Sequence, residues 1–301
     1  MGLTALFQVA AALVAPPAAP VSLPALTPRQ KAALVVVSGL PAPRGVAGVI
    51  VREYDRRAPR PRDALVLVDQ EGGIASAFDD LPPGVAASTY ATRRQAFRAG
   101  RLTGRALRRA GVHVDLAPVV DLAGGPLGSR HFRDPALARA FARGLAAGRI
   151  GACVKHFPGL GTAGVSTDES PSVRARLRSR ELGAFRAAVR DGVPCVMVSH
   201  AFYRGHGRAR ATFEPKIYKL LRRTGFDGVA ITDSVSVFGS KWAVTAARKS
   251  IRAGADLVLY TNGPDARRAI RALVPWARRG LLDEHVARVL ELRHALGLRR
   301  P

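Results

Sequence analysis

The chain has 301 residues, a formal net charge of +25, a mean hydropathy of +0.05 and 48% hydrophobic residues. These values allow a large apolar core and exclude wholesale disorder. The length suits a single large domain, such as an α/β barrel of about 250 residues. With two cysteines, Cys153 and Cys195, the chain is neither a disulfide-rich scaffold nor a zinc-ribbon protein. Both cysteines lie in apolar runs of neighbouring predicted strands. We expect buried free thiols, with a single bridge as the alternative that the sequence leaves open.

The positive charge has two possible explanations, a polyanionic partner or a bias towards arginine spread over helix faces. Arginines recur along almost every predicted helix, as in residues 93–109 and 174–190, and no single face or tail collects them. The second explanation is therefore favoured, although association with anionic cell-wall polymers stays possible. A nucleic-acid partner is not expected, because aromatic residues make up only 6% of the chain and no stacking stripe is present.

Residues 1–24 form an apolar segment of about signal-peptide length, rich in alanine and proline. The segment lacks the basic residues that normally precede such a signal, so a simple apolar extension is the alternative. We expect an exported or envelope-associated protein, with a cytoplasmic location as the other possibility. Residues 25–301 are predicted to form one domain.

From residue 32 onwards, short apolar runs alternate with amphipathic stretches. The predicted strands are Ala33–Ser38, Val46–Val51, Ala64–Asp69, His113–Asp121, Ile150–His156, Pro194–His200, Gly228–Asp233 and Asp256–Tyr260. The predicted helices are Ala91–Ala110, Pro135–Gly148, Ser179–Asp191, Glu214–Thr224, Ala243–Ala253, Asp265–Arg278 and Asp283–Leu296. The Gly/Ser/Thr-rich segment Pro158–Arg174 is predicted to be a mobile loop. Eight strands alternating with helices predict the α/β class and a (β/α)₈ TIM-type barrel, with an open doubly wound sheet as the alternative.

A barrel of this kind carries its chemistry at the carboxyl ends of its strands. Polar residues stand where the predicted strands stop, namely Asp69, Asp121, Lys155, His156, Ser199, His200 and Asp233. This clustering favours an enzyme over a structural barrel.

The residue types narrow the chemistry. HExxH, CxxC and glycine-rich phosphate motifs are absent from the sequence, so neither a metal nor a cofactor is expected. A carboxylate nucleophile with hydrogen-bonding helpers suits glycoside hydrolysis, whereas Lys155 at a strand end also suits Schiff-base chemistry. The residues alone leave both open.

Five motifs then occur in order: DQEGG, LAPVVD, GSRHF, KHFPGLG and GFDGVAITDS. Together they resemble the N-terminal barrel domain of glycoside hydrolase family three, over about Leu26 to Leu259. The similarity is greatest to its single-domain β-N-acetylglucosaminidases, which have no second domain. The resemblance implies a retaining hydrolase with Asp233 as its nucleophile. It also implies that Asp69, Arg130, Lys155 and His156 bind the sugar, and that His200 lines the same pocket. Asp115 and Asp121 are predicted to be structural, and His113 and His131 to be structural or exposed.

The sequence departs from the family pattern in the loop after KHFPG. The family's acid/base is an Asp-Ser-His triplet, for which this chain has Ser166, Thr167 and Asp168, and Leu160 replaces a further histidine. Ile74 also stands where an arginine usually follows DQEGG. We predict that Asp168, or secondarily Glu169, is the general acid with a pKa raised in a dry, closed site. Alternatively, the substrate has an activated leaving group, the acid comes from elsewhere, or hydrolysis is lost and the chain only binds sugar.

The expected function is therefore exo-hydrolysis of β-linked N-acetylhexosamines, such as those of cell-wall glycan fragments. The alternatives are a hydrolase of another β-hexoside, a sugar-binding protein without activity, and a Schiff-base lyase.

Overall fold

The computed structural model describes residues 25–170 and 172–298. Eight strands form the central sheet: β1 (Val36–Ser38), β2 (Gly48–Ile50), β3 (Leu65–Val68), β6 (Val114–Asp115), β7 (Gly151–Phe157), β9 (Cys195–Val198), β11 (Val229–Thr232) and β12 (Val258–Leu259). Each overlaps one predicted strand. The strands are buried and rich in Val, Ile and Leu, as expected for strands covered on both faces.

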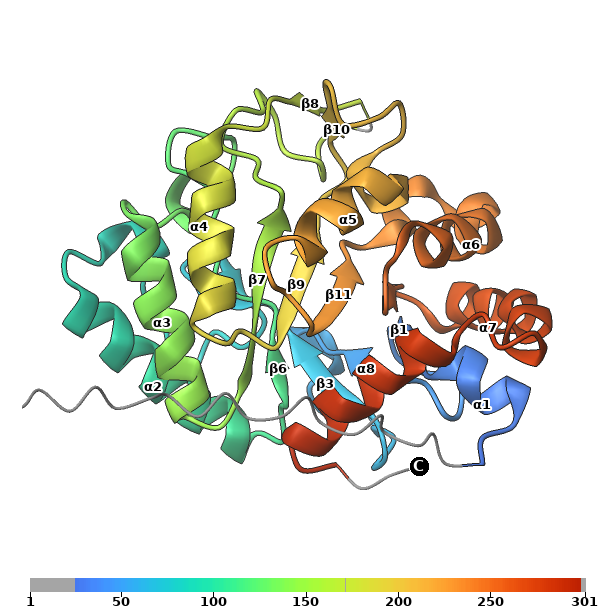
Figure 1. Cartoon of the computed structure of the whole chain (residues 1–301). Coiled ribbons are helices and arrows are strands. Elements are labelled where there is room, and N and C mark those ends of the chain that lie inside the picture. The colour runs from blue at the N-terminus through green and yellow to red at the C-terminus, as the bar shows by residue number, and fades with distance from the viewer. Residues whose placement is uncertain (1–24, 171, 299–301) are drawn as a thin grey trace, which may run out of the picture.

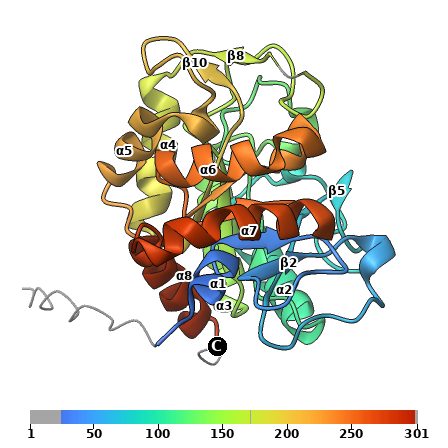
Figure 2. The same ribbon diagram turned by 90° about the vertical axis from the view of Figure 1, so that its right-hand side faces the viewer.

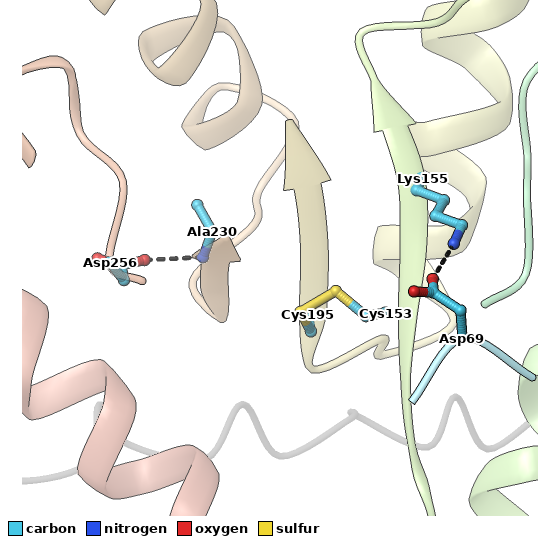
Figure 3. Close-up of a disulfide and its surroundings, with 6 residues drawn as sticks. All are labelled: Asp69, Cys153, Lys155, Cys195, Ala230 and Asp256. Carbon is cyan, nitrogen blue, oxygen red and sulfur yellow. Dashed lines mark hydrogen bonds and ion pairs between the residues drawn. A yellow bond between two sulfur atoms is a disulfide. The ribbon is translucent and has the colours of Figure 1, made fainter. Parts of the chain in front are cut away.

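The sheet closes into a barrel. Its strands are parallel and follow the order β11-β9-β7-β6-β3-β2-β1-β12. A parallel bridge between Ile231 and Leu257 joins the two ends, and the Thr232 N–H donates to the Leu257 carbonyl at 3.0 Å. At the same seam, the buried Asp256 carboxylate accepts the Ala230 N–H at 2.8 Å (Figure 3). The predicted TIM-type barrel is confirmed.

Helices cover the outside of the barrel (Figure 1). They are α1 (Pro28–Ala33), α2 (Arg93–Arg109), α3 (Pro135–Ala147), α4 (Ser179–Arg190), α5 (Pro215–Arg222), α6 (Ala243–Ala253), α7 (Gly263–Arg278) and α8 (Asp283–Ala295). Figure 2 shows α6 and α7 side by side along one flank, with α1 next to α7. All but α1 were predicted. That short helix starts at a capping box in which Thr27 and Gln30 satisfy each other's backbone N–H groups.

The two cysteines form a disulfide, so the prediction of free thiols was wrong. Cys153 of β7 and Cys195 of β9 are directly opposite each other in neighbouring strands, with Cα atoms 4.3 Å apart (Figure 3). Both side chains belong to the apolar cluster inside the barrel, with Leu65, Leu67 and Met197. Apolar burial in each strand was visible in the sequence, but the register that makes the two residues partners was not.

Short additional strands stand beyond the carboxyl ends of the barrel strands. β4 (Gln70–Gly72) pairs with β5 (Ala75–Ser76), and β8 (Arg174–Ala175) pairs in parallel with β10 (Phe202–Tyr203). The β8–β10 pair lies at the top of Figure 1, above β7 and β9. The predicted loop Pro158–Arg174 is confirmed over residues 158–170 and 172–173, which contain no helix or strand, but its last residue, Arg174, belongs to β8. Its mobility stays a prediction.

The predicted N-terminal export segment, residues 1–24, lies outside the described residues. Within residues 25–170 and 172–298, none of the helices combines the length and the apolar character needed to cross a bilayer.

Candidate active site

A pocket of about 310 Å³ opens at the carboxyl ends of the barrel strands. Six of the seven predicted site residues line it: Asp69, Arg130, Lys155, His156, Asp168 and Asp233. They come from the ends of β3, β7 and β11, from the short 3-10 helix Gly128–Arg130 and from the loop after β7. The folded chain thus brings together residues that are up to 164 positions apart, from Asp69 to Asp233.

Asp233 follows β11 directly and is partly buried. Its backbone N–H donates to the Val198 carbonyl at 3.0 Å, and its Oδ1 accepts the Ser234 N–H at 2.7 Å. Burial alone would raise the pKa of Asp233, but the charges of His200, His156 and Lys155 and the Ser234 N–H together hold that pKa below its ordinary value. The carboxyl group is therefore ionised at neutral pH.

Glu71 is the charged residue at the base of the pocket that the sequence reasoning missed. Its side chain is 3% exposed, and its Oε1 lies 2.6 Å from Lys155 Nζ. Arg130 grips the same carboxylate with two bonds, Nε to Oε2 at 2.7 Å and Nη2 to Oε1 at 2.8 Å. The only signal for Glu71 was its place in DQEGG, two residues after Asp69.

Asp69, Glu71, Arg130 and Lys155 form one ion-pair network, and its contacts determine the charge states of its members. Burial opposes ionisation of Glu71, but Lys155 and Arg130 outweigh it and lower the pKa of Glu71 to about 2. Burial likewise opposes protonation of Lys155, yet the Asp69 and Glu71 carboxylates raise its pKa well above the ordinary value. Lys155 Nζ lies 2.6 Å from Asp69 Oδ1, and the Asp69 side chain is 49% exposed (Figure 3). Asp69 is therefore the member of the network that a ligand reaches most easily.

Asp121 has the structural role that was predicted for it. Its carboxylate accepts the backbone N–H groups of His156 and Leu160 and lies 2.7 Å from His156 Nδ1. The pairing fixes the imidazole plane and leaves Nε2 as the ring nitrogen available to a ligand in the pocket. Asp121 thus acts on the site through His156.

Two other residues at strand ends, His200 and Asp115, hold segments of the chain next to the pocket. His200 does not line it: its Nδ1 pairs with Thr212 Oγ1 at 2.8 Å and its Nε2 with the Ser234 carbonyl at 2.9 Å. His200 therefore holds the loop that follows Asp233. Asp115 is fully buried and accepts the Gln70 N–H at 2.9 Å, and burial raises its pKa well above the ordinary value. His113 is also structural, since its Nδ1 accepts the Val66 N–H at 3.0 Å.

The loop after β7 brings Asp168, but not Glu169, to the rim of the pocket. Both side chains are exposed, so the predicted dry and closed surroundings are absent from this conformation. Against the effect of burial, Glu71, with smaller contributions from Asp69 and Asp168, raises the pKa of Arg130. Burial lowers the pKa of His200, although the Asp233 and Asp168 carboxylates oppose that shift. Leu160, which stands in place of the family histidine, is fully buried in the hydrophobic core. Ile74 is 87% exposed beside the lining residue Ala75.

The described residues contain no group of three or more His, Cys, Asp or Glu side chains suited to a metal ion. Besides Glu71, the lining includes residues that were not predicted, among them Arg52, Ser234 and Thr261. Ser234 ends the motif GFDGVAITDS, but Arg52 and Thr261 lie outside the five motifs.

Known proteins resemble the chain in sequence. Residues 48–292 match the model of the glycosyl hydrolase family 3 N terminal domain. The chain is 33% identical over 243 residues to a β-hexosaminidase of Stenotrophomonas maltophilia, with 72% of each chain covered. It is 35% identical over 241 residues to a β-hexosaminidase of Methylococcus capsulatus, with 71% of each chain covered.

Solved structures agree in fold. A family 3 β-N-acetylglucosaminidase from Paenibacillus sp. superposes with a TM-score of 0.82 at 24% identity, covering 92% of this chain and 64% of that one. A family 3 glycosyl hydrolase from Mycobacterium smegmatis gives a TM-score of 0.79 at 25% identity, covering 89% and 97%. With its barrel, its pocket of carboxylates and cations, and these relatives, the chain belongs to glycosyl hydrolase family 3 and is a glycosidase.

Proposed function

We propose that this glycosidase is a retaining exo-β-N-acetylhexosaminidase that removes terminal β-linked amino sugars, such as those of cell-wall glycan fragments. The observation that carries the proposal is the ionised Asp233 carboxylate at the end of β11, in one pocket with Asp69, Lys155 and His156. The names of the curated relatives, β-hexosaminidases, support the choice of sugar.

The proposed reaction has two steps. One oxygen of Asp233 is held by the Ser234 N–H, and the other attacks the anomeric carbon. The bond from that carbon to the leaving oxygen breaks, and a general acid protonates this oxygen. The resulting glycosyl ester on Asp233 is then hydrolysed by water, which the same group deprotonates acting as a base. The configuration at the anomeric carbon is retained.

We assign the general acid/base role to Asp168. It is the carboxyl group of the loop that lines the pocket, whereas Glu169 is not among the lining residues. Because the Asp168 side chain is exposed in this conformation, the proposal requires the loop to close over a bound sugar, which would remove water from the carboxyl group.

The remaining pocket residues bind the sugar in this proposal. Asp69 accepts hydrogen bonds from the hydroxyl groups of the sugar. Lys155, Arg130 and His156 donate hydrogen bonds to its hydroxyl oxygens. Asp69 and Glu71 already engage Lys155, so an ammonium with three N–H groups keeps one for the ligand.

The raised pKa of Lys155, caused by those carboxylates against the opposing effect of burial, also argues against the Schiff-base lyase. An amine must lose its proton before it can attack a carbonyl group.

A second candidate, sugar binding without hydrolysis, is favoured by one observation. This observation is the altered loop after β7. Asp168 is exposed and has no histidine partner such as the family triplet provides, and Leu160 is buried in the hydrophobic core. The assay below separates the two candidates.

We also propose that the protein is exported. The buried disulfide between Cys153 and Cys195 supports this, because such bonds persist mainly outside reducing compartments. The apolar residues 1–24 are compatible with a signal segment.

The test is hydrolysis of an activated aryl β-N-acetylglucosaminide beside the matching aryl β-glucoside. An activated leaving group needs little acid assistance, so the assay does not depend on Asp168. Preference for the acetylated sugar is expected, and preference for the glucoside would overturn the proposed specificity. Absence of release from both, with binding of the amino sugar retained, would establish the non-hydrolytic candidate instead.

A further inference from the structure

A second pocket, of about 820 Å³, lies at the β8–β10 pair and is lined by five arginines: Arg174, Arg176, Arg178, Arg204 and Arg208. We call it the arginine groove. No aspartate or glutamate is among its lining residues. The expectation that no single face collects the arginines was therefore wrong, because the fold joins two arginine-rich segments 26 residues apart, at Arg178 and Arg204.

The sequence of β8 and its extension explains one wall. In the run from Val173 to Arg178, apolar residues alternate with arginines, and Val173 and Ala175 are buried whereas Arg174 and Arg176 are exposed. Side chains two residues apart on an extended chain lie on the same face, roughly 6.6 Å apart. This wall therefore presents a row of arginine side chains at alternate positions of the extended chain. Arg204 and Arg208, after β10, form the other wall.

Close ion pairs within the described residues do not neutralise these charges. Arg178 does act on Glu181, because its charge opposes the rise that burial causes in the pKa of Glu181. Across residues 25–170 and 172–298, none of the five guanidinium groups has a carboxylate within 4.0 Å. By contrast, Arg139 of α3 forms an ion pair of 2.7 Å with Asp191, the residue that follows α4. Five like charges around one concave space repel each other, and a concave surface concentrates their potential on whatever enters. Bound anionic groups would relieve that repulsion.

Two aromatic residues line the groove, Phe202 and Tyr203, and neither is free for stacking. Tyr203 is buried. Arg174 lies over the Phe202 ring at 5.7 Å and Arg210 at 4.7 Å. Proteins that bind single-stranded nucleic acid stack bases on open aromatic faces. The groove therefore suits a charged backbone without bases.

We propose that the arginine groove binds a linear polymer that carries phosphate groups along its chain and has no nucleobases. Arginine is suited to phosphate because its planar fork donates two parallel N–H bonds to the oxygens. The row along β8 meets successive phosphates, and Arg204 and Arg208 meet them from the opposite wall. This inference is independent of the hydrolytic function proposed above, since none of the five arginines lines the active-site pocket.

The test uses inorganic polyphosphate as the probe and two matched variants of the full chain. In the groove variant Arg174, Arg176, Arg204 and Arg208 become Gln. In the control variant Arg94, Arg98, Arg101 and Arg105, four exposed arginines on one face of α2, become Gln. Both variants lose the same charge, but only one loses the groove. Urea unfolding midpoints equal to that of wild type would show that both variants are folded.

The groove variant should bind polyphosphate at least about 10-fold more weakly. The slope of the logarithm of its binding constant against the logarithm of the salt concentration should become less steep by about 0.7 for each lost phosphate contact. The control variant should stay within about 2-fold of wild type. Equal losses in both variants would overturn the proposal, because only net charge would then matter. So would binding of polyglutamate as strong as that of polyphosphate, or groove-dependent preference for single-stranded DNA.

Discussion

Lys155 Nζ lies 2.6 Å from Oε1 of Glu71, and each side chain is only 3% exposed. Both groups are ionised in the folded protein, because each shifts the pKa of the other towards its charged form against the effect of burial. This pair, with Arg130 on its far side, fixes the floor of the active-site pocket. Its removal should therefore affect folding as well as sugar binding.

Glu71→Gln should lower the free energy of unfolding by about 3–5 kcal/mol, since it leaves buried cations with an uncompensated charge. Urea unfolding at neutral pH measures this. Glu284→Gln is the control, because the Glu284 side chain is 89% exposed and its pair with Arg288 spans 3.9 Å. Equal stability of the two variants would contradict the network described here.

The same carboxyl group predicts a dependence on pH. The pKa of Glu71 is about 2 in the folded protein, below its ordinary value of 4.5. The unfolded chain therefore takes up the proton first, and the stability from Glu71 is lost as the pH falls from about 5 towards 2. The stability of wild type should fall more steeply across that window than the stability of Glu71→Gln. Parallel curves would refute the assignment.

His113 predicts a second pH range in which the stability of the protein changes. Burial, followed by the charges of Arg108 and Arg293, lowers the pKa of His113 to about 4, and its Nδ1 accepts the Val66 N–H. The unfolded histidine binds a proton near pH 6.5, so stability should decline as the pH falls from about 6.5 to 4. His113→Gln can keep an acceptor without titrating and should lose this decline. An NMR titration of the ring with a midpoint above 6 would contradict the prediction.

The disulfide should contribute to stability. It closes a loop with a sequence separation of 42 residues, for which the chain-entropy relation gives about 4 kcal/mol. The double variant Cys153→Ala and Cys195→Ala should therefore unfold at a clearly lower urea concentration than wild type. Mass spectrometry of the wild type should show no free thiol. Two alkylated cysteines in unreduced protein would show that the bridge is absent.

Asp168→Asn should slow hydrolysis of a poorly activated substrate by about 10²-fold or more, because the general acid is lost. Hydrolysis of the activated aryl glycoside should change far less in its first step. Glu169→Gln, the adjacent exposed carboxyl group, is the control and should behave as wild type on both substrates. If Asp168→Asn shows no difference between the two substrates, the acid lies elsewhere.

Most of the barrel was predictable, because buried parallel strands leave uninterrupted apolar runs and each run corresponds to one strand. Contacts between distant segments were not. The pairing of Cys153 with Cys195 depends on strand register. The ion pair of Arg130 with Glu71 depends on how the segment between β6 and α3, which carries Arg130, is placed against the residues that follow β3. The arginine groove escaped prediction for the same reason: alternation in β8 was visible, but its neighbour β10 was not. Asp69, Lys155, His156 and Asp233 were found because they lie at strand ends, whereas Arg130 and Asp168 were found through the family resemblance.

Covalent labelling of Asp233 tests the central claim most directly. A 5-fluoro N-acetylglucosaminide with an activated leaving group keeps the acetamido group and forms the glycosyl ester, but the fluorine slows hydrolysis of that ester. The intermediate should therefore accumulate as a mass increase of one sugar. Peptide mapping should place that sugar on Asp233, and Asp233→Ala should remain unlabelled. Asp227→Ala, an exposed carboxylate just before β11, should label as wild type does. A label on any other residue, or an unlabelled wild type that still hydrolyses the activated glycoside, would contradict Asp233 as the nucleophile.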